Sequence, residues 1–176
     1  IPVHPYTVFN GMAEADLRSL VAYLRTVPPV RRAAPPKRIT VPFFESVFLP
    51  AWLAAFAPRE NPPPEPPTAG VARGEYLVRA VGHCGECHTP RTRTQATDNS
   101  RFLAGNPTGP EGSVVPNLTP DPATGLQWTE EQIAEYLGTG NTPDGDVAGG
   151  PMAEVIQGTA AGYKDLTAAD RLAIAR

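Results

Sequence analysis

Two cysteines and a histidine stand together near the middle of the chain, in Cys84-Gly85-Glu86-Cys87-His88. Two thiols separated by two residues and followed at once by histidine form the attachment pattern of a c-type haem. Each thiol bonds to one vinyl group, and this spacing lets both sulfurs reach neighbouring pyrrole rings. The next residue then offers an imidazole nitrogen to the iron. The pattern therefore predicts one covalent haem c that is held by Cys84 and Cys87, with His88 as an iron ligand.

Other uses of paired cysteines fit this chain less well. A thioredoxin-like dithiol is one alternative, but no strand–helix alternation surrounds the motif. A zinc site would need two more ligands, and the chain has only two cysteines and three histidines. The remaining histidines are His4, far upstream, and His83, which is expected at the surface beside the attachment site. Lys164 is a remote substitute for an iron ligand.

Composition narrows the fold and the partners. The formal net charge of −3 predicts no surface for nucleic acid, and no run of residues is apolar enough to span a membrane. The 22 prolines and 16 glycines predict long loops. We therefore expect an all-α fold, a small domain of short helices and long loops around a covalent haem. One helix and a proline-rich linker would precede this domain.

The prolines divide the chain into three expected parts. Residues 1–27 read as a loop and a helix at 13–26 with an apolar stripe, and we interpret them as the closing part of a truncated upstream haem domain. Residues 28–67 are expected to form a proline-rich linker, which is extended and stiff over 58–67. Its apolar segment 41–56 is expected to pack along its own chain, with docking on a partner protein as the alternative. Residues 68–176 form the haem domain, whose last helix is cut short.

A helix over 68–82 should lead into the cysteine motif, with Thr68 as its cap. Glycine inside a helix costs about 1 kcal/mol relative to alanine, so Gly74 suggests the close approach of another helix. The buried side is expected to consist of Val71, Tyr76, Leu77, Val78 and Val81.

Two further helices carry start signals. Thr129 and Gln132 form a capping box, and the helix that they start should end near Gly138 and Gly140. Thr167 should begin the last helix, with Asp170 at the position that reaches back to the cap. The segments between the helices, 89–127 and 141–151, are rich in proline and glycine and are predicted to be loops, as is 1–11.

Residues 69–176 resemble a haem domain of the class I c-type cytochromes. The resemblance is greatest to the multi-haem cytochrome subunits of bacterial periplasmic dehydrogenases. Beside the haem motif, the matching segments are Gly74-Glu75-Tyr76-Leu77, Pro116-Asn117-Leu118-Thr119-Pro120-Asp121, Gly125 through Trp128-Thr129, and Gly150-Pro151-Met152-Ala153-Glu154-Val155.

The resemblance implies roles for particular residues. Met152 would be the sixth iron ligand through its thioether, although a core methionine is the alternative. Met152 follows Gly149-Gly150-Pro151, which suggests a loop rather than a helix core, and this position favours the iron ligand. The carbonyl of Pro116 would orient the His88 imidazole, and Asn117 and Trp128 would approach the haem propionates. The last helix would cross the first near Gly74 and Tyr76. His4 stands where relatives carry an axial methionine, and is either a ligand of an upstream haem or an exposed loop residue.

The resemblance also implies electron transfer rather than catalysis, because an imidazole and a thioether would fill both axial positions of the iron. A periplasmic dehydrogenase subunit would donate electrons, and another cytochrome or an oxidase of the respiratory chain would accept them. Haem is attached outside the cytoplasmic membrane, so we expect the protein in the periplasm or on the outer side of that membrane. Two alternatives stay open: a peroxidase-like or sulfur-oxidising haem enzyme with an open sixth site, and a structural or sensing haem module.

Overall fold

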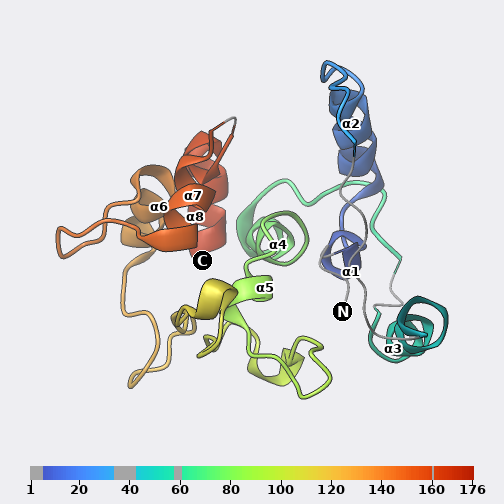
Figure 1. Ribbon diagram of the computed structural model, residues 1–176. Coiled ribbons are helices and arrows are strands. Elements are labelled where there is room, and N and C mark those ends of the chain that lie inside the picture. The colour runs from blue at the N-terminus through green and yellow to red at the C-terminus, as the bar shows by residue number, and fades with distance from the viewer. Residues whose placement is uncertain (1–5, 34–42, 58–60, 160) are drawn as a thin grey trace. The chain divides into compact units, whose positions relative to one another are not determined.

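A computed structural model describes residues 6–33, 43–57, 61–159 and 161–176 of the chain (Figure 1). The chain separates into two compact units, residues 1–66 and 67–176. The described residues form helices joined by loops, and their β pairings are isolated bridges. The prediction of an all-α fold is therefore confirmed, whereas the division into three parts remains a prediction. His4 lies outside the described residues.

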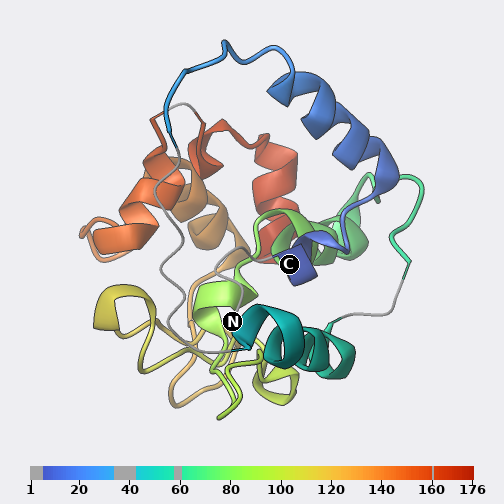
Figure 2. The ribbon, with the colours of Figure 1, turned by 45° about the vertical axis from the view of Figure 1, so that its right-hand side comes forward.

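The described helices of the first unit are short. They are α1 (Tyr6–Phe9), α2 (Glu14–Leu24), the π-helix η1 (Phe44–Phe48) and α3 (Leu49–Phe56), and η1 runs into α3 without a break (Figure 2). The helix expected at 13–26 is present as α2. The expectation of a loop over 1–11 was wrong for α1, because a single turn of four residues is too short to produce an apolar pattern.

The start of α2 is capped by backbone atoms of the linker rather than by a side chain. Ala13 stands at the N-cap position and makes no side-chain bond. Instead the amides of Glu14 and Ala15 donate to the carbonyls of Pro63 and Pro64, at 3.0 and 3.2 Å. A helix begins with amides that have no partner inside it. The proline-rich residues therefore stabilise α2 by supplying acceptors.

Large apolar side chains of the first unit are exposed. On α2 the predicted stripe includes Leu20 and Leu24, which are 43% and 57% exposed. In the described part of the apolar segment, rings pair along the helix, Phe44 with Phe48 at 5.4 Å and Trp52 with Phe56 at 5.3 Å between centroids. These local pairs cover only part of each ring. Phe43, Val47, Phe48 and Phe56 are exposed. The packing of 41–56 on its own chain or on a partner stays a prediction.

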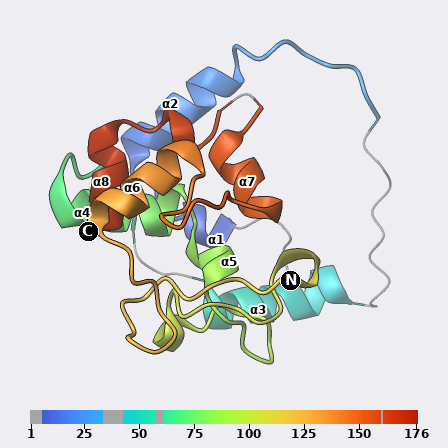
Figure 3. The same ribbon diagram turned by 90° about the vertical axis from the view of Figure 1, so that its left-hand side faces the viewer.

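The second unit contains the cysteine motif. Its α-helices are α4 (Gly70–Tyr76), α5 (Gly85–His88), α6 (Glu130–Thr139), α7 (Gly150–Gln157) and α8 (Ala168–Ala175). Shorter turns are the π-helix η2 (Leu77–Val81) and the 3-10 helices η3 (Asn99–Arg101), η4 (Pro110–Gly112) and η5 (Tyr163–Asp165). Helix α8 packs on both α4 and α6 (Figure 3). Fully or nearly buried side chains from five of these helices contribute to the core, Tyr76, Leu77, Leu137, Ile156 and Ala173.

The crossing of α4 and α8 depends on Gly74, as predicted. A Cβ at Gly74 would overlap the backbone carbonyl of Ala173. Beside this contact Arg73 forms two hydrogen bonds to the carboxylate of Asp170, at 2.8 and 3.2 Å. This ion pair lowers the pKa of Asp170. Asp170 therefore joins the two helices, and its carboxylate also interacts with the side chain of Thr167. The Thr167 hydroxyl caps α8 by accepting from the amide of Asp170 at 3.0 Å.

The first helix of the unit differs from its prediction at its start. Ala69, not Thr68, is the N-cap residue, and Thr68 makes no capping bond. Val71 is 65% exposed because it lies in the first turn, outside the core. Ala80 is buried, which its small side chain did not predict. The expected burial of Tyr76 and Leu77 is confirmed, and Val78 and Val81 are half-buried.

The capping box of α6 is confirmed. The hydroxyl of Thr129 accepts from the amide of Gln132 at 3.3 Å, and the Gln132 side chain accepts from the amide of Thr129 at 2.9 Å. The helix ends at Gly140, which has a left-handed φ of 82°. Thr129 thus fixes the point at which the preceding long loop ends and α6 begins.

Candidate haem site

The attachment cysteines follow a turn that ends η2. The amide of Gly82 donates to the carbonyl of Leu77 at 2.6 Å, and the amide of Cys84 donates to the carbonyl of Val78 at 3.1 Å. Between them His83 is half-buried and has a left-handed φ of 44°. A residue with a Cβ adopts such a conformation at a cost of about 1–3 kcal/mol. The turn redirects the chain so that Cys84 stands at the start of α5.

Both cysteines are free thiols on a single helical turn. The amide of His88 donates to the carbonyl of Cys84 at 3.0 Å, which closes the turn. Burial raises the pKa of the Cys84 thiol, and burial together with the carboxylate of Glu86 raises that of Cys87. Both groups are therefore protonated at neutral pH. The protonated thiol is the form that adds to a vinyl group.

The imidazole of His88 is buried and oriented by one backbone atom. Its Nδ1 lies 2.9 Å from the carbonyl oxygen of Pro116. A carbonyl can only accept, so Nδ1 carries the proton and Nε2 keeps its lone pair. Burial lowers the pKa of His88, which favours the neutral ring. The geometry therefore leaves a neutral nitrogen donor of the kind that iron binds.

The loop that carries Pro116 is held against the motif by backbone bonds. The amide of Gly105 donates to the carbonyl of His88 at 2.8 Å, and the amide of Leu103 donates to the hydroxyl of Thr89 at 3.0 Å. Gly105 has a φ of 84°, and a Cβ there would lie 2.9 Å from the carbonyl of Val115. Thr89 is fully buried. The sequence analysis missed Thr89, and only its position next to the histidine could have indicated a role.

A half-buried ion pair lies beside the cysteines. Arg91 donates to the carboxylate of Glu86 at 2.6 Å and to its backbone carbonyl at 3.0 Å. Arg91 also donates to the hydroxyl of Thr97 at 3.0 Å. These bonds fix the residue between the two cysteines to the loop that follows α5. The sequence analysis did not identify this pair, because no helical or strand spacing relates its members.

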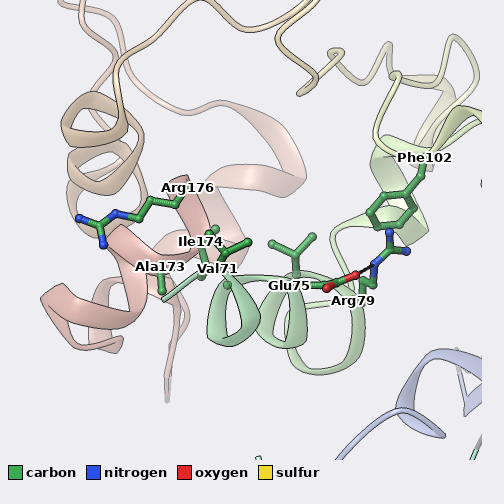
Figure 4. Close-up of a pocket in the computed structure, with 9 residues that line it drawn as sticks. Val71, Glu75, Arg79, Phe102, Ala173, Ile174 and Arg176 are labelled. Carbon is green, nitrogen blue, oxygen red and sulfur yellow. Dashed lines mark hydrogen bonds and ion pairs between the residues drawn. The ribbon is translucent and has the colours of Figure 1, made fainter. Parts of the chain in front are cut away.

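A pocket of about 200 Å³ opens between α4 and α8, and Phe102 forms one end of it (Figure 4). The guanidinium of Arg79 lies 4.0 Å from the centre of the Phe102 ring and is paired with Glu75 at 2.9 Å. The same ring packs on Gly85 of α5, where a Cβ would overlap it. The two cysteines and His88 do not line this pocket, and the contact with α5 is made by the Phe102 ring.

Met152 occupies the first turn of α7 and is half-buried. The expectation of a loop at this position was therefore wrong. Proline is tolerated in the first turn of a helix, so Pro151 starts α7 rather than preventing it. Helix α7 packs on α6 and η5. The ligation of iron by Met152 remains a prediction.

The two residues expected near the propionates are engaged in local contacts. The side-chain oxygen of Asn117 accepts from the amide and hydroxyl of Thr119, at 2.9 and 2.7 Å, and its amide donates to Thr124 at 3.1 Å. Trp128 packs edge-on against Tyr136, with ring centroids 5.2 Å apart. Contact of either residue with a propionate stays a prediction.

The residues present fit a covalent haem. The motif supplies two protonated thiols on one turn and a neutral imidazole with a free Nε2. A metal site made by protein ligands alone fits less well, because the described ranges contain no cluster of three or more His, Cys, Asp or Glu side chains.

Comparison with known proteins decides between these uses of the motif. No family model matches the chain. A diheme cytochrome c-type protein of Cereibacter sphaeroides is 43% identical over 186 residues, which cover 99% of this chain and 56% of that protein. The fructose dehydrogenase cytochrome subunit of Gluconobacter japonicus is 37% identical over 160 residues, which cover 89% of this chain and 32% of that subunit. The chain is a homologue of bacterial c-type cytochromes.

A third relative is the cytochrome c subunit of a quinone alcohol dehydrogenase from Gluconacetobacter polyoxogenes. It is 34% identical over 168 residues, which cover 88% of the chain and 35% of that subunit. The chain thus spans about half the length of the diheme relative and about a third of the two dehydrogenase subunits. The resemblance inferred from the sequence is confirmed.

Proposed function

We propose that residues 68–176 are an electron-carrying haem domain, with Cys84 and Cys87 holding one haem c and His88 as the proximal iron ligand. The observation that carries the proposal is the bond from His88 Nδ1 to the carbonyl of Pro116 at 2.9 Å. It fixes the ring and its tautomer, so that Nε2 is available immediately after two attachment thiols. Homology to cytochrome subunits supports the same role.

The protein residues would have distinct tasks. The haem, when bound, supplies an iron that cycles between Fe(III) and Fe(II). The Pro116 carbonyl holds the His88 ring and strengthens it as a donor. Met152 would bind iron on the opposite side through its thioether, which favours Fe(II) and raises the reduction potential. If both His88 and Met152 held the iron, neither a substrate nor oxygen would need to bind, and the chain would act as a carrier and not as the catalytic subunit.

We infer the partners and the location from the relatives. Cytochrome subunits of fructose and alcohol dehydrogenases are similar to this chain, which supports a dehydrogenase as electron donor. The acceptor would be another cytochrome or an oxidase of the respiratory chain, in the periplasm or at the outer side of the cytoplasmic membrane. Among the helices of the described residues, none is both long and apolar enough to cross a membrane. Weak, transient contacts suit a carrier that must release each partner.

The experiment is an optical spectrum of the purified holoprotein, oxidised and reduced, with a matched pair of variants. Met152→Leu and Met12→Leu each remove a thioether at nearly constant volume. The wild type and Met12→Leu should show the weak far-red band of methionine-bound ferric haem, and Met152→Leu should lose it. A high-spin ferric wild type whose spectrum shifts with dilute cyanide or azide would refute the ligation. That outcome would favour a haem enzyme with an open sixth site.

A further inference from the structure

The hydroxyl of Tyr163 reaches the attachment turn from a distant part of the second unit. Tyr163 lies in η5, between α7 and α8, and is partly buried. Its Oη lies 2.7 Å from the carbonyl oxygen of Gly82 and 3.9 Å from the Sγ of Cys84. One side chain therefore contacts the residue before and the residue after His83. The tyrosine was not singled out by the motif or by the resemblance.

The direction of these contacts follows from the hydrogen atoms available. A carbonyl oxygen only accepts, so the Tyr163 hydroxyl donates its single proton to Gly82. Its oxygen lone pairs are then left to face the sulfur of Cys84. Burial and the neighbouring cysteine raise the pKa of Tyr163, so the hydroxyl keeps this proton. The negative end of the hydroxyl dipole therefore points towards the sulfur.

The turn needs such support. His83 holds a left-handed φ of 44°, which a residue with a Cβ keeps only when its surroundings determine it. Backbone bonds already engage the amides of Gly82 and Cys84. The tyrosine adds a partner for the Gly82 carbonyl. A Cβ on Gly82 would lie 2.9 Å from the Tyr163 oxygen, so glycine leaves the room that the hydroxyl occupies.

We propose that Tyr163 is a positioning residue of the haem site, whose hydroxyl fixes the Gly82–Cys84 turn and sets the local field at the Cys84 sulfur. This inference rests on the proposed function, because it gives Tyr163 a task in that site. Tyr163 acts through the first attachment cysteine and not through the iron ligands. Two consequences follow: the hydroxyl slows local opening of the turn, and its oxygen disfavours the added electron of the reduced haem.

The test compares Tyr163→Phe with a matched control, Tyr23→Phe, whose ring is 62% exposed on α2. Hydrogen exchange of the full holoprotein should be about three- to tenfold faster at the Gly82–Cys84 amides in Tyr163→Phe, which is the loss of one ordinary hydrogen bond. Removing the hydroxyl oxygen should also favour reduction roughly twofold, a rise in potential of about 18 mV for a one-electron couple. Tyr23→Phe should change neither quantity.

Gly82→Ala provides a second variant, because its Cβ would lie 2.9 Å from the Tyr163 hydroxyl and 3.0 Å from the carbonyl oxygen of Leu77. It should speed exchange in the same turn, and its effect combined with Tyr163→Phe should be smaller than the product of the single effects. Equal acceleration at all amides of the second unit, or no change in exchange and potential, would overturn the proposal and leave Tyr163 a packing residue. A wild type without covalent haem would refute the proposed function instead, while exchange at Gly82–Cys84 would still decide the role of Tyr163.

Discussion

Replacement of Gly74 by alanine tests the packing of the second unit most directly. Alanine is the better helix former, so the change alone would stabilise α4 by about 1 kcal/mol. The new Cβ, however, would overlap the carbonyl of Ala173 in α8. Overpacking of this kind costs about 1–3 kcal/mol. The upper end applies because a backbone carbonyl, unlike the end of a side chain, cannot rotate away. We therefore expect a net destabilisation of about 2 kcal/mol.

The measurement is guanidinium unfolding of the holoprotein followed by circular dichroism, with the free energy taken from the midpoint and slope. Gly138→Ala is the matched control, since Gly138 is also inside a helix but the nearest atoms to its Cβ would belong to the guanidinium of Arg171, at 3.0 Å or more. This group is held by hydrogen bonds to the carbonyls of Lys164 and Leu166, but it is the end of a side chain and needs to shift only a few tenths of an ångström, so the control should cost less than Gly74→Ala. An unchanged or raised midpoint in Gly74→Ala would refute the close crossing of α4 and α8.

Two further predictions concern helix ends. The pKa of Asp170 is held below its unfolded value of about 3.9 by Arg73, so the pair contributes stability above pH 4 that is lost as the pH falls through the folded pKa. Asp170→Asn should be less stable than wild type at pH 7, and the difference should narrow by pH 3 in denaturant titrations; a constant difference would contradict this. Thr129→Ala should cost about 1 kcal/mol, because the amide of Gln132 loses its cap. Thr129→Ser should retain most of that stability, and equal losses would argue against the cap.

The features predicted correctly from the sequence are those whose physics is local. The cysteine motif, the capping box at Thr129 and the helix before the motif depend on residues within a few positions of one another. Gly74 is an exception, because a glycine inside an apolar helical pattern indicates a neighbour that the sequence does not name. The structure supplied that neighbour, the backbone at Ala173.

The features that were missed depend on contacts between distant segments. Tyr163 reaches Gly82 across 81 positions, and no periodicity relates the two. The sequence did not predict the start of α7, because its glycine and proline indicate a loop. Both residues are nevertheless acceptable in the first turn of a helix. Val71 looked like a core residue by spacing, but helix spacing does not show where the neighbouring helix ends. Tertiary packing therefore decided each of these cases.

The crossing of α4 and α8 also has a kinetic meaning. It joins the first and last helices of the second unit, so almost the whole unit lies in the loop that this contact closes. Closing so long a loop costs chain entropy before the contact stabilises the fold. Such pairings therefore form late in folding. The turn from Gly82 to His88, by contrast, can form from neighbouring residues alone. A newly made chain would thus present its two thiols early, while its ends are still apart, and become rigid around them only when α8 docks.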